Sequence, residues 1–259
     1  MTRFLDRGEG RIAWDDAGEG PLVVLVPGLG DVRAEYRHVV PLLTAAGRRV
    51  VSLDLRGHGE SDVRWSDYSA VALGEDVVAL LTRLDAGPAV LIGTSMGAAA
   101  VAWVAANAPE KVEALVLIGP FVRDVPPGSR LAGWLRSAVI AFAASGPWGP
   151  WMWGKYLRSI HRRPPADLEA HVGRVRANLS EPGRMTALAA MMRTSKAAVE
   201  ARLDRIRAPT LVVMGTADPD FVDPTAEAET VARRTGGRVA AMEGLGHYPQ
   251  AEAPATFMD

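Results

Sequence analysis

The chain has 259 residues, of which 48% are hydrophobic, and its formal net charge is −1. A chain of this length and composition can bury a sizeable core as one domain with an insertion. The small charge argues against a general nucleic-acid binder, and the lack of cysteine excludes disulfides, thiol catalysis and cysteine–metal sites.

The first ten residues are polar and charged, and they contain no apolar core of the kind found in a signal peptide. We therefore expect a cytoplasmic protein. Only three of the 29 basic residues are lysines, which indicates a GC-rich bacterial genome through its codon use. The five histidines show no metal-ligand spacing, so we expect no metal site.

Short β-rich runs recur along the chain and are separated by helical patterns. The expected strands are Arg11–Asp15, Leu22–Val26, Val50–Asp54, Ala89–Gly93, Ala114–Ile118, Thr210–Met214 and Arg238–Met242. The expected helices are Glu35–Ala46, Ser69–Leu84, Ser95–Ala108 and Asp223–Arg234. The inner runs are continuously apolar, which is typical of parallel strands covered on both faces. The alternation predicts an α/β fold with a mostly parallel, doubly wound sheet. The terminal pair of runs is expected to add antiparallel edge strands, and the closing helix should be short.

The alternation stops between Ile118 and Thr210, where helical stretches fill the sequence and no run reads as a strand. From Arg123 to Arg207 there are 15 basic and 6 acidic residues, a balance of +9, so the remainder carries −10. We therefore predict a core domain over residues 1–120 and 208–259, interrupted by a helical insertion over residues 121–207.

Four tryptophans lie in this insertion: Trp134, Trp148, Trp151 and Trp153. Its centre, Ser137 to Gly154, has no charged residue and approaches the length of a membrane span. Gly146-Pro147 and Gly149-Pro150 would break a helix in the middle of that stretch, which argues against a span. We favour aromatic side chains that line an apolar pocket and dock the insertion on the core. Contact with a lipid interface, helped by the arginines, is the alternative.

The pentapeptide Gly93-Thr94-Ser95-Met96-Gly97 joins an apolar run to an alanine-rich stretch. Two flanking glycines allow a turn so sharp that the serine hydroxyl projects from its tip. The first N–H groups of the following helix lie near that hydroxyl without intrahelical partners. Ser95 is therefore a candidate nucleophile, and the alternative is an ordinary helix N-cap.

A nucleophilic serine needs a base and an acid to orient it. His247 follows the last expected strand, in a loop where a rigid scaffold would present a base. The other histidines lie in an expected helix, a tight turn or a basic segment: His38, His58, His161 and His171. Asp218 follows the strand that begins at Thr210 and is the candidate acid. Turn roles are the alternatives for His247 and for Asp218, which precedes Pro219.

The order Ser95, Asp218, His247 resembles that of the α/β-hydrolase family, and the resemblance covers nearly the whole chain. Residues 22–30 are similar to the family's oxyanion-loop strand, and residues 50–61 to the strand and turn before its nucleophile. The resemblance implies the α/β-hydrolase fold, with about eight strands and a helical cap (lid) inserted over the active site at residues 121–207.

The same resemblance implies that the oxyanion hole is made by the backbone N–H groups of Leu29 and Met96. The family commonly has His-Gly where this chain has Pro27-Gly28. Proline lacks an N–H, but the expected donor belongs to Leu29, so the oxyanion hole should survive.

The acid has rivals. Asp220 and Asp223 lie close by, and some family members take the acid from an earlier loop, where Asp124 lies. The spacing after Gly215 favours Asp218. A second set of residues is expected to be structural and not catalytic: Asp54, Arg56 and His58.

These residues imply a serine hydrolase that cleaves small-molecule carboxylic esters or lactones with an apolar portion, through an acyl-enzyme and without a cofactor or metal. Serine at the nucleophile position argues against dehalogenases and epoxide hydrolases, which use a carboxylate there. A cofactor-free haloperoxidase or perhydrolase, an enol-lactonase, a carbon–carbon bond hydrolase, an amidase or a hydrolase-like receptor stays open on the same triad. The sequence names neither the substrate nor the oligomeric state.

Overall fold

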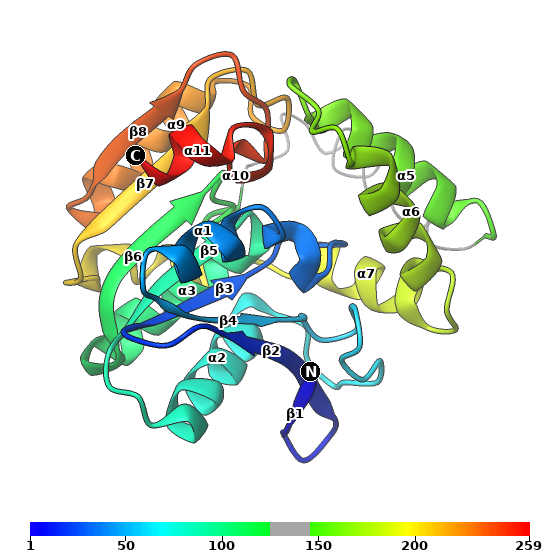
Figure 1. The fold of residues 1–259 in the computed structure, drawn as a ribbon, viewed down its shortest axis with the longest axis horizontal. Coiled ribbons are helices and arrows are strands. Elements are labelled where there is room, and N and C mark those ends of the chain that lie inside the picture. The colour runs from blue at the N-terminus through cyan, green and yellow to red at the C-terminus, as the bar shows by residue number, and fades with distance from the viewer. Residues whose placement is uncertain (125–145) are drawn as a thin grey trace.

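The computed structural model describes residues 1–124 and 146–259. An eight-stranded sheet lies at its centre, in the order β1-β2-β4-β3-β5-β6-β7-β8 (Figure 1). The strands are β1 Arg3–Asp6, β2 Arg11–Ala17, β3 Leu22–Val26, β4 Arg49–Leu53, β5 Ala89–Thr94, β6 Val112–Ile118, β7 Thr210–Gly215 and β8 Arg238–Met242. Strands β3 to β8 are parallel, and β1 and β2 are antiparallel to their neighbours. This sheet confirms the predicted fold class.

Helices cover both faces of the sheet, which is why its inner strands are apolar on both sides. The helices before the insertion are α1 Val39–Ala45, α2 Ala70–Leu84 and α3 Met96–Asn107, and those after it are α9 Pro224–Thr235, α10 Pro249–Glu252 and α11 Pro254–Met258. Along β3, Val24 belongs to the apolar cluster that includes residues of α2, α3 and α9. Val23 and Leu25 belong to the cluster that includes residues of α1 and α11. This alternation follows from the two-residue period of a strand.

The run Arg11–Asp15 adds an antiparallel strand, as predicted, but the sheet edges differ from the prediction. β1 was not predicted, because four residues with only Leu5 buried carry no readable pattern. Because β1 is the outermost strand, β2 is the second strand of the sheet and not its edge. β8 is the other edge strand, but it is parallel to β7 because α9 crosses between them. The predicted helix from Glu35 to Ala46 is divided into the 3-10 turn η1, Arg33–Tyr36, and α1.

Between β6 and β7 the described residues form helices, as predicted. They are α5 Gly149–Ile160, α6 Leu168–Leu179, α7 Arg184–Met192 and α8 Ala197–Glu200. Helices α5, α6 and α7 lie to one side of the sheet (Figure 1). Leu157, Val172 and Leu188 form an apolar cluster there that also includes Val32 and Tyr248 of the core.

Trp134 and the first part of the predicted apolar stretch, residues 137–145, lie outside the described residues. Trp148 and Trp151 are exposed on α5 or just before it, whereas Trp153 faces the core. None of the helices in residues 1–124 and 146–259 is long and apolar enough to cross a membrane.

Candidate active site

Ser95 stands at the junction between β5 and α3 in a conformation that few serines adopt. Its φ is 55° and its ψ is −113°. The side chain makes no capping hydrogen bond to α3, so it does not act as an N-cap. The flanking glycines are needed because the backbone is crowded: an added Cβ at Gly93 would lie 2.4 Å from the Gly97 carbonyl oxygen, and one at Gly97 would lie 2.2 Å from that of Val26. The turn therefore presents the Ser95 hydroxyl at the carboxyl edge of the sheet.

His247 and Asp218 meet at the same edge. His247 Nδ1 lies 2.7 Å from Asp218 Oδ2, and both side chains are buried. Since a carboxylate accepts, the ring donates its Nδ1–H and leaves Nε2 as the available acceptor. The ring also packs against the backbone at Gly119, where an added Cβ would lie 2.9 Å from Cε1. Ser95 and His247 line one cavity, so the structure brings the three predicted residues together.

The rival acids are used in different ways. Asp124 accepts hydrogen bonds from Ser195 Oγ and Lys196 N, and Asp223 caps α9 by accepting from Ala226 N. Asp220 lies closer to the base, with Oδ2 at 3.7 Å from His247 Nδ1. That distance is beyond a hydrogen bond, so Asp218 is the hydrogen-bonded acid.

The surroundings of His247 favour its charged form. Burial lowers the pKa of the imidazole, but the negative charge of Asp218, its hydrogen bond and the charge of Asp220 outweigh burial and raise the pKa to about 9. The two carboxylates therefore stabilise the imidazolium that His247 becomes when it takes up a proton.

The predicted oxyanion donors lie beside Ser95. Leu29 and Met96 line the cavity with it, and Met96 is the first residue of α3, so its N–H has no intrahelical acceptor. The loop that holds Leu29 is fixed from below by Glu35, whose Oε2 accepts the Gly28 N–H at 2.7 Å. Burial and the charge of Asp31 raise the pKa of Glu35 to about 8. The loop is therefore anchored through the Gly28 N–H, although Pro27 has no N–H of its own.

The next residues of this loop are held by side chains that the sequence did not assign to it. The Gly30 N–H donates to His58 Nε2 at 3.1 Å, and His58 Nδ1 donates to the Arg56 carbonyl at 2.8 Å. Burial lowers the pKa of His58 to about 4, so the ring stays neutral and can accept. The Trp153 indole of α5 donates to the Gly30 carbonyl at 2.8 Å. His58 therefore supports the loop that carries Leu29, the predicted oxyanion loop.

A buried pair joins the same loop to α6. Asp31 Oδ1 lies 2.9 Å from His171 Nε2, and both side chains are almost fully buried. Burial opposes the charged carboxylate, but the charge of His171 and its hydrogen bond prevail and lower the pKa of Asp31. The predicted oxyanion loop is thus tied to α5 and to α6.

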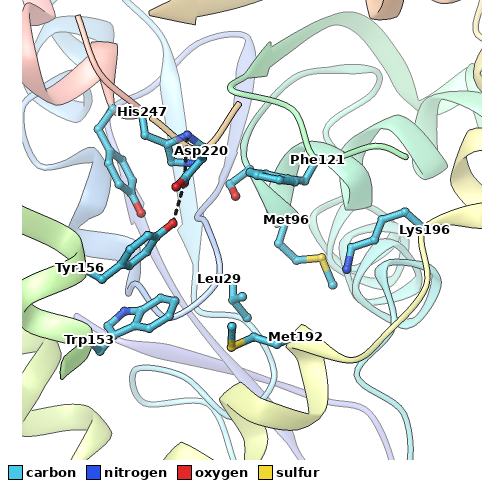
Figure 2. Close-up of a pocket in the computed structure, with 11 residues that line it drawn as sticks. Leu29, Met96, Phe121, Trp153, Tyr156, Met192, Lys196, Asp220 and His247 are labelled. Carbon is cyan, nitrogen blue, oxygen red and sulfur yellow. Dashed lines mark hydrogen bonds and ion pairs between the residues drawn. The ribbon is translucent and has the colours of Figure 1, made fainter. Parts of the chain in front are cut away.

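Ser95 lines a cavity of about 480 Å³, and Figure 2 shows residues of its wall. Its wall is mainly apolar and aromatic: Leu29, Met96, Phe121, Trp153, Tyr156, Met192 and Tyr248. Asp220 and Lys196 add charged groups, and Figure 2 shows them on opposite sides of the cavity. A cavity of this size and character suits a small ligand with an apolar portion.

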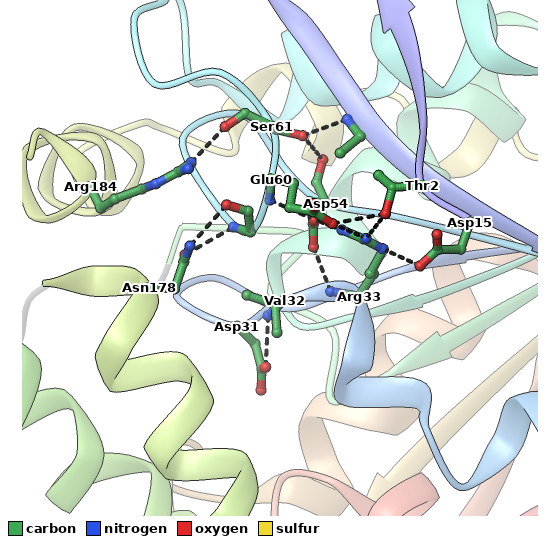
Figure 3. Close-up of polar contacts among 12 residues, drawn as sticks. Thr2, Asp15, Asp31, Val32, Arg33, Asp54, Glu60, Ser61, Asn178 and Arg184 are labelled. Atoms are coloured by element: carbon green, nitrogen blue, oxygen red, sulfur yellow. Dashed lines mark hydrogen bonds and ion pairs between the residues drawn. The ribbon is translucent and has the colours of Figure 1, made fainter. Parts of the chain in front are cut away.

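The turn from Arg56 to Ser61 is held from two directions. Arg33 of η1 pairs with Asp54 and Glu60 on one side. On the other side, Asn178 of α6 exchanges two hydrogen bonds with the Gly59 backbone, at 2.9 and 2.8 Å, and Arg184 of α7 donates to the Ser61 carbonyl at 2.6 Å (Figure 3). The turn is therefore a structural link between core and insertion.

Three side chains of metal-ligating type lie within 4.8 Å of one another in the part of the chain that the structure describes: Asp218, Asp220 and His247. Asp218 Oδ2 and His247 Nδ1 already satisfy each other in a hydrogen bond. We therefore assign two of these three side chains, Asp218 and His247, to the histidine–aspartate pair.

A mostly parallel α/β sheet with a strained serine, a histidine–aspartate pair and an apolar cavity at its carboxyl edge defines the class of α/β hydrolases. Residues 21–254 match the family of the alpha/beta hydrolase fold. The chain belongs to this family of hydrolases.

Three proteins similar to this chain cover most of its length. A pimeloyl-[acyl-carrier protein] methyl ester esterase of Neisseria meningitidis is 30% identical over 238 residues, which span 88% of this chain and 86% of that protein. The crystal structure of a hydrolase from Pseudomonas aeruginosa is 28% identical, with a TM-score of 0.78 over 99% of this chain and 95% of that one. An enol-lactonase from Burkholderia xenovorans has a TM-score of 0.80 over 98% and 96% at 22% identity, which shows the fold alone.

Proposed function

We propose that the protein is a serine hydrolase that cleaves carboxylic esters or lactones with an apolar portion. One observation carries the proposal: Ser95, held at a φ of 55° without a capping bond, opens onto the cavity that His247 also lines. A serine hydroxyl that makes no capping hydrogen bond to the following helix is available to attack a substrate. The esterase relative, which by its name acts on a methyl ester, supports the choice of ester over other bonds.

The mechanism follows from the residues in their places. His247 Nε2 takes the proton of the Ser95 hydroxyl as the oxygen attacks the carbonyl carbon. Asp218 holds Nδ1–H at 2.7 Å and so fixes the tautomer that leaves Nε2 free to accept. The N–H groups of Leu29 and Met96 stabilise the oxyanion, and one such donor is typically worth about 3 kcal/mol.

Collapse of the tetrahedral intermediate breaks the ester bond, and His247 gives its proton to the leaving alcohol oxygen. Water then attacks acyl-Ser95 while His247 again accepts a proton, and the acid is released with Ser95 restored. The apolar wall that includes Phe121, Trp153 and Met192 holds the apolar portion of the substrate and excludes water. In a lactone the acyl and alcohol portions stay joined, and the same steps open the ring.

Hydrolysis of p-nitrophenyl esters of increasing acyl length, together with a set of lactones, tests the proposal. Ser95→Ala should lower kcat by about 10⁶-fold, which leaves no measurable turnover. Ser180→Ala, at an exposed serine, is the matched control and should keep wild-type rates. A fluorophosphonate should add its mass to wild type and to Ser180→Ala, but not to Ser95→Ala.

Equal rates in Ser95→Ala and wild type would contradict the proposal. The proposal would also be contradicted if wild-type protein that unfolds cooperatively, and is therefore folded, turned over none of the esters and lactones. If the protein is active, the acyl length with the highest kcat/KM will indicate how much of the 480 Å³ cavity the acyl group fills.

A further inference from the structure

A second carboxylate faces the base. Asp220 belongs to the same turn as Asp218, and its backbone N–H donates to Asp218 Oδ1 at 3.0 Å. The turn therefore carries two carboxylates toward one imidazole, at 2.7 Å from Asp218 and 3.7 Å from Asp220. One Nδ1–H can bond only one of them, so the other acts by its charge.

Helix α5 supplies a hydrogen bond to this second carboxylate. The hydroxyl of Tyr156, on α5, donates to Asp220 Oδ2 at 2.5 Å. Figure 2 shows the tyrosine on the cavity wall with its hydroxyl directed at Asp220. The same oxygen of Asp220 faces His247 Nδ1. Tyr156 thus bonds the carboxylate oxygen that would otherwise be free to approach the ring.

Helix α5 also holds the backbone of the base. The His247 N–H donates to the carbonyl of Ile160, the last residue of α5, at 2.9 Å. One turn earlier in α5, the Tyr156 ring lies against the Trp153 ring, with 4.8 Å between the ring centroids. Helix α5 therefore carries Tyr156 and also holds the backbone of His247. Asp220 lies between these two side chains.

The charged and titratable groups around His247 come from several elements. Asp218 and Asp220 lie on the loop after β7, Glu35 acts from η1, and Tyr248 meets the ring edge-on at 5.3 Å. Lys196 lines the far wall of the cavity. Burial is the main reason that the pKa of Asp220 lies above its ordinary value, and the charge of Asp218 adds to the rise. The charge of His247 and the Tyr156 hydrogen bond act in the opposite direction and limit the rise in this pKa. Burial makes each of these charges count for more than it would in water.

We propose that Tyr156 and Asp220 form a positioning pair that sets the charge beside the base: the tyrosine hydroxyl keeps the Asp220 carboxylate ionised and apart from Nδ1, where it stabilises the imidazolium as a second counter-charge beside Asp218. This inference rests on the proposed function, because it assigns His247 as the base. Neither residue contacts the reacting atoms. Both act through His247, and a substrate that fills the cavity covers them and removes the remaining water.

The pKa of His247, followed by NMR of its imidazole in the free protein, tests the pair without any substrate. Asp220→Asn removes one negative charge and should move the titration midpoint to lower pH by about one unit, the usual effect of an opposite charge at this distance. Asp223→Asn removes the same charge from an exposed position of the same loop. It keeps the ability to cap α9, so its midpoint should equal that of wild type.

Tyr156→Phe shows whether the tyrosine acts through Asp220. Without the hydroxyl, burial should leave Asp220 protonated over more of the pH range, so the midpoint of His247 should move in the same direction as in Asp220→Asn, but less. In the Asp220→Asn background, Tyr156→Phe should cause no further shift. A role confined to packing would move both backgrounds equally or neither.

Kinetics give the second readout. His247 must be neutral to accept the Ser95 proton, so kcat/KM should rise with pH through its pKa, and this limb should follow the NMR midpoint in each variant. The plateau of Asp220→Asn should fall about tenfold, because the lost charge also stabilises the imidazolium of the transition state. An unchanged midpoint in Asp220→Asn, or equal Tyr156→Phe shifts in both backgrounds, would overturn the inference. Failure to hydrolyse any ester would count against the proposed function alone.

Discussion

Two of the regions in which the inserted helices contact the core have partners of different kinds. Helix α5 meets the loops that carry the candidate catalytic groups, through Trp153 to the Gly30 carbonyl and Tyr156 to Asp220. The end of α6 and the start of α7 meet the turn after β4, through Asn178 to Gly59 and Arg184 to the Ser61 carbonyl. Both regions use ordinary hydrogen bonds at ordinary distances. We infer that the first set affects the rate of reaction and the second affects stability, because a contact acts through what its partner does.

Among the substitutions that bear on this comparison, the largest effect is expected in the core itself. Asp218→Asn keeps the shape of the acid, but an amide that donates to Nδ1 forces the wrong tautomer on His247, so kcat should fall by about 10⁴-fold. The fall should far exceed the tenfold loss expected for Asp220→Asn, two residues away. Steady-state kinetics on one p-nitrophenyl ester compares the two. Similar losses in both variants would mean that the carboxylates share the role of the acid.

Trp153→Phe sharpens the comparison on the side of α5. The substitution removes the N–H that bonds the Gly30 carbonyl but keeps an aromatic ring on the cavity wall. The oxyanion loop should become less ordered, and kcat should fall about tenfold with a smaller change in KM, as for a lost transition-state contact. Trp151→Phe, at an exposed tryptophan of the same helix, should keep wild-type constants. A rise in KM without a change in kcat would assign Trp153 to substrate binding only.

Asn178→Ala should give the smallest change in rate. It removes two hydrogen bonds to the Gly59 backbone, so the free energy of unfolding should fall by about 1–2 kcal/mol. Because this partner carries no reacting group, kcat/KM should stay within about twofold of wild type. Denaturant unfolding and ester hydrolysis on the same preparation measure both. A loss of rate at unchanged stability would erase the distinction between the two regions.

The sequence predicted what depends on local pattern. Continuous apolar runs indicated the parallel strands, and the pentapeptide around Ser95 indicated the turn between β5 and α3. Spacing after each strand selected Asp218 and His247, which the structure places 2.7 Å apart. Each of these predictions used residues close to one another in the chain.

The rest depended on contacts between distant segments. His58 could be recognised as part of a tight turn, but its bond to Gly30 spans 28 residues. Asp220 was considered only as a rival acid, because its neighbour Tyr156 lies 64 residues earlier and no spacing connects them. β1 was missed because a strand of four residues can be read only from its pairing with β2.

The position of α5 has a consequence for how such a protein can change. Trp153 and Tyr156 form part of the cavity wall and, through the same side chains, hold the oxyanion loop and the second carboxylate. Selection for a different substrate, in nature or in a directed-evolution library, would therefore alter turnover whenever it replaced these two residues. Phe121 and Met192 line the same cavity from other segments. Specificity can evolve more independently there, and library positions are better chosen on that side.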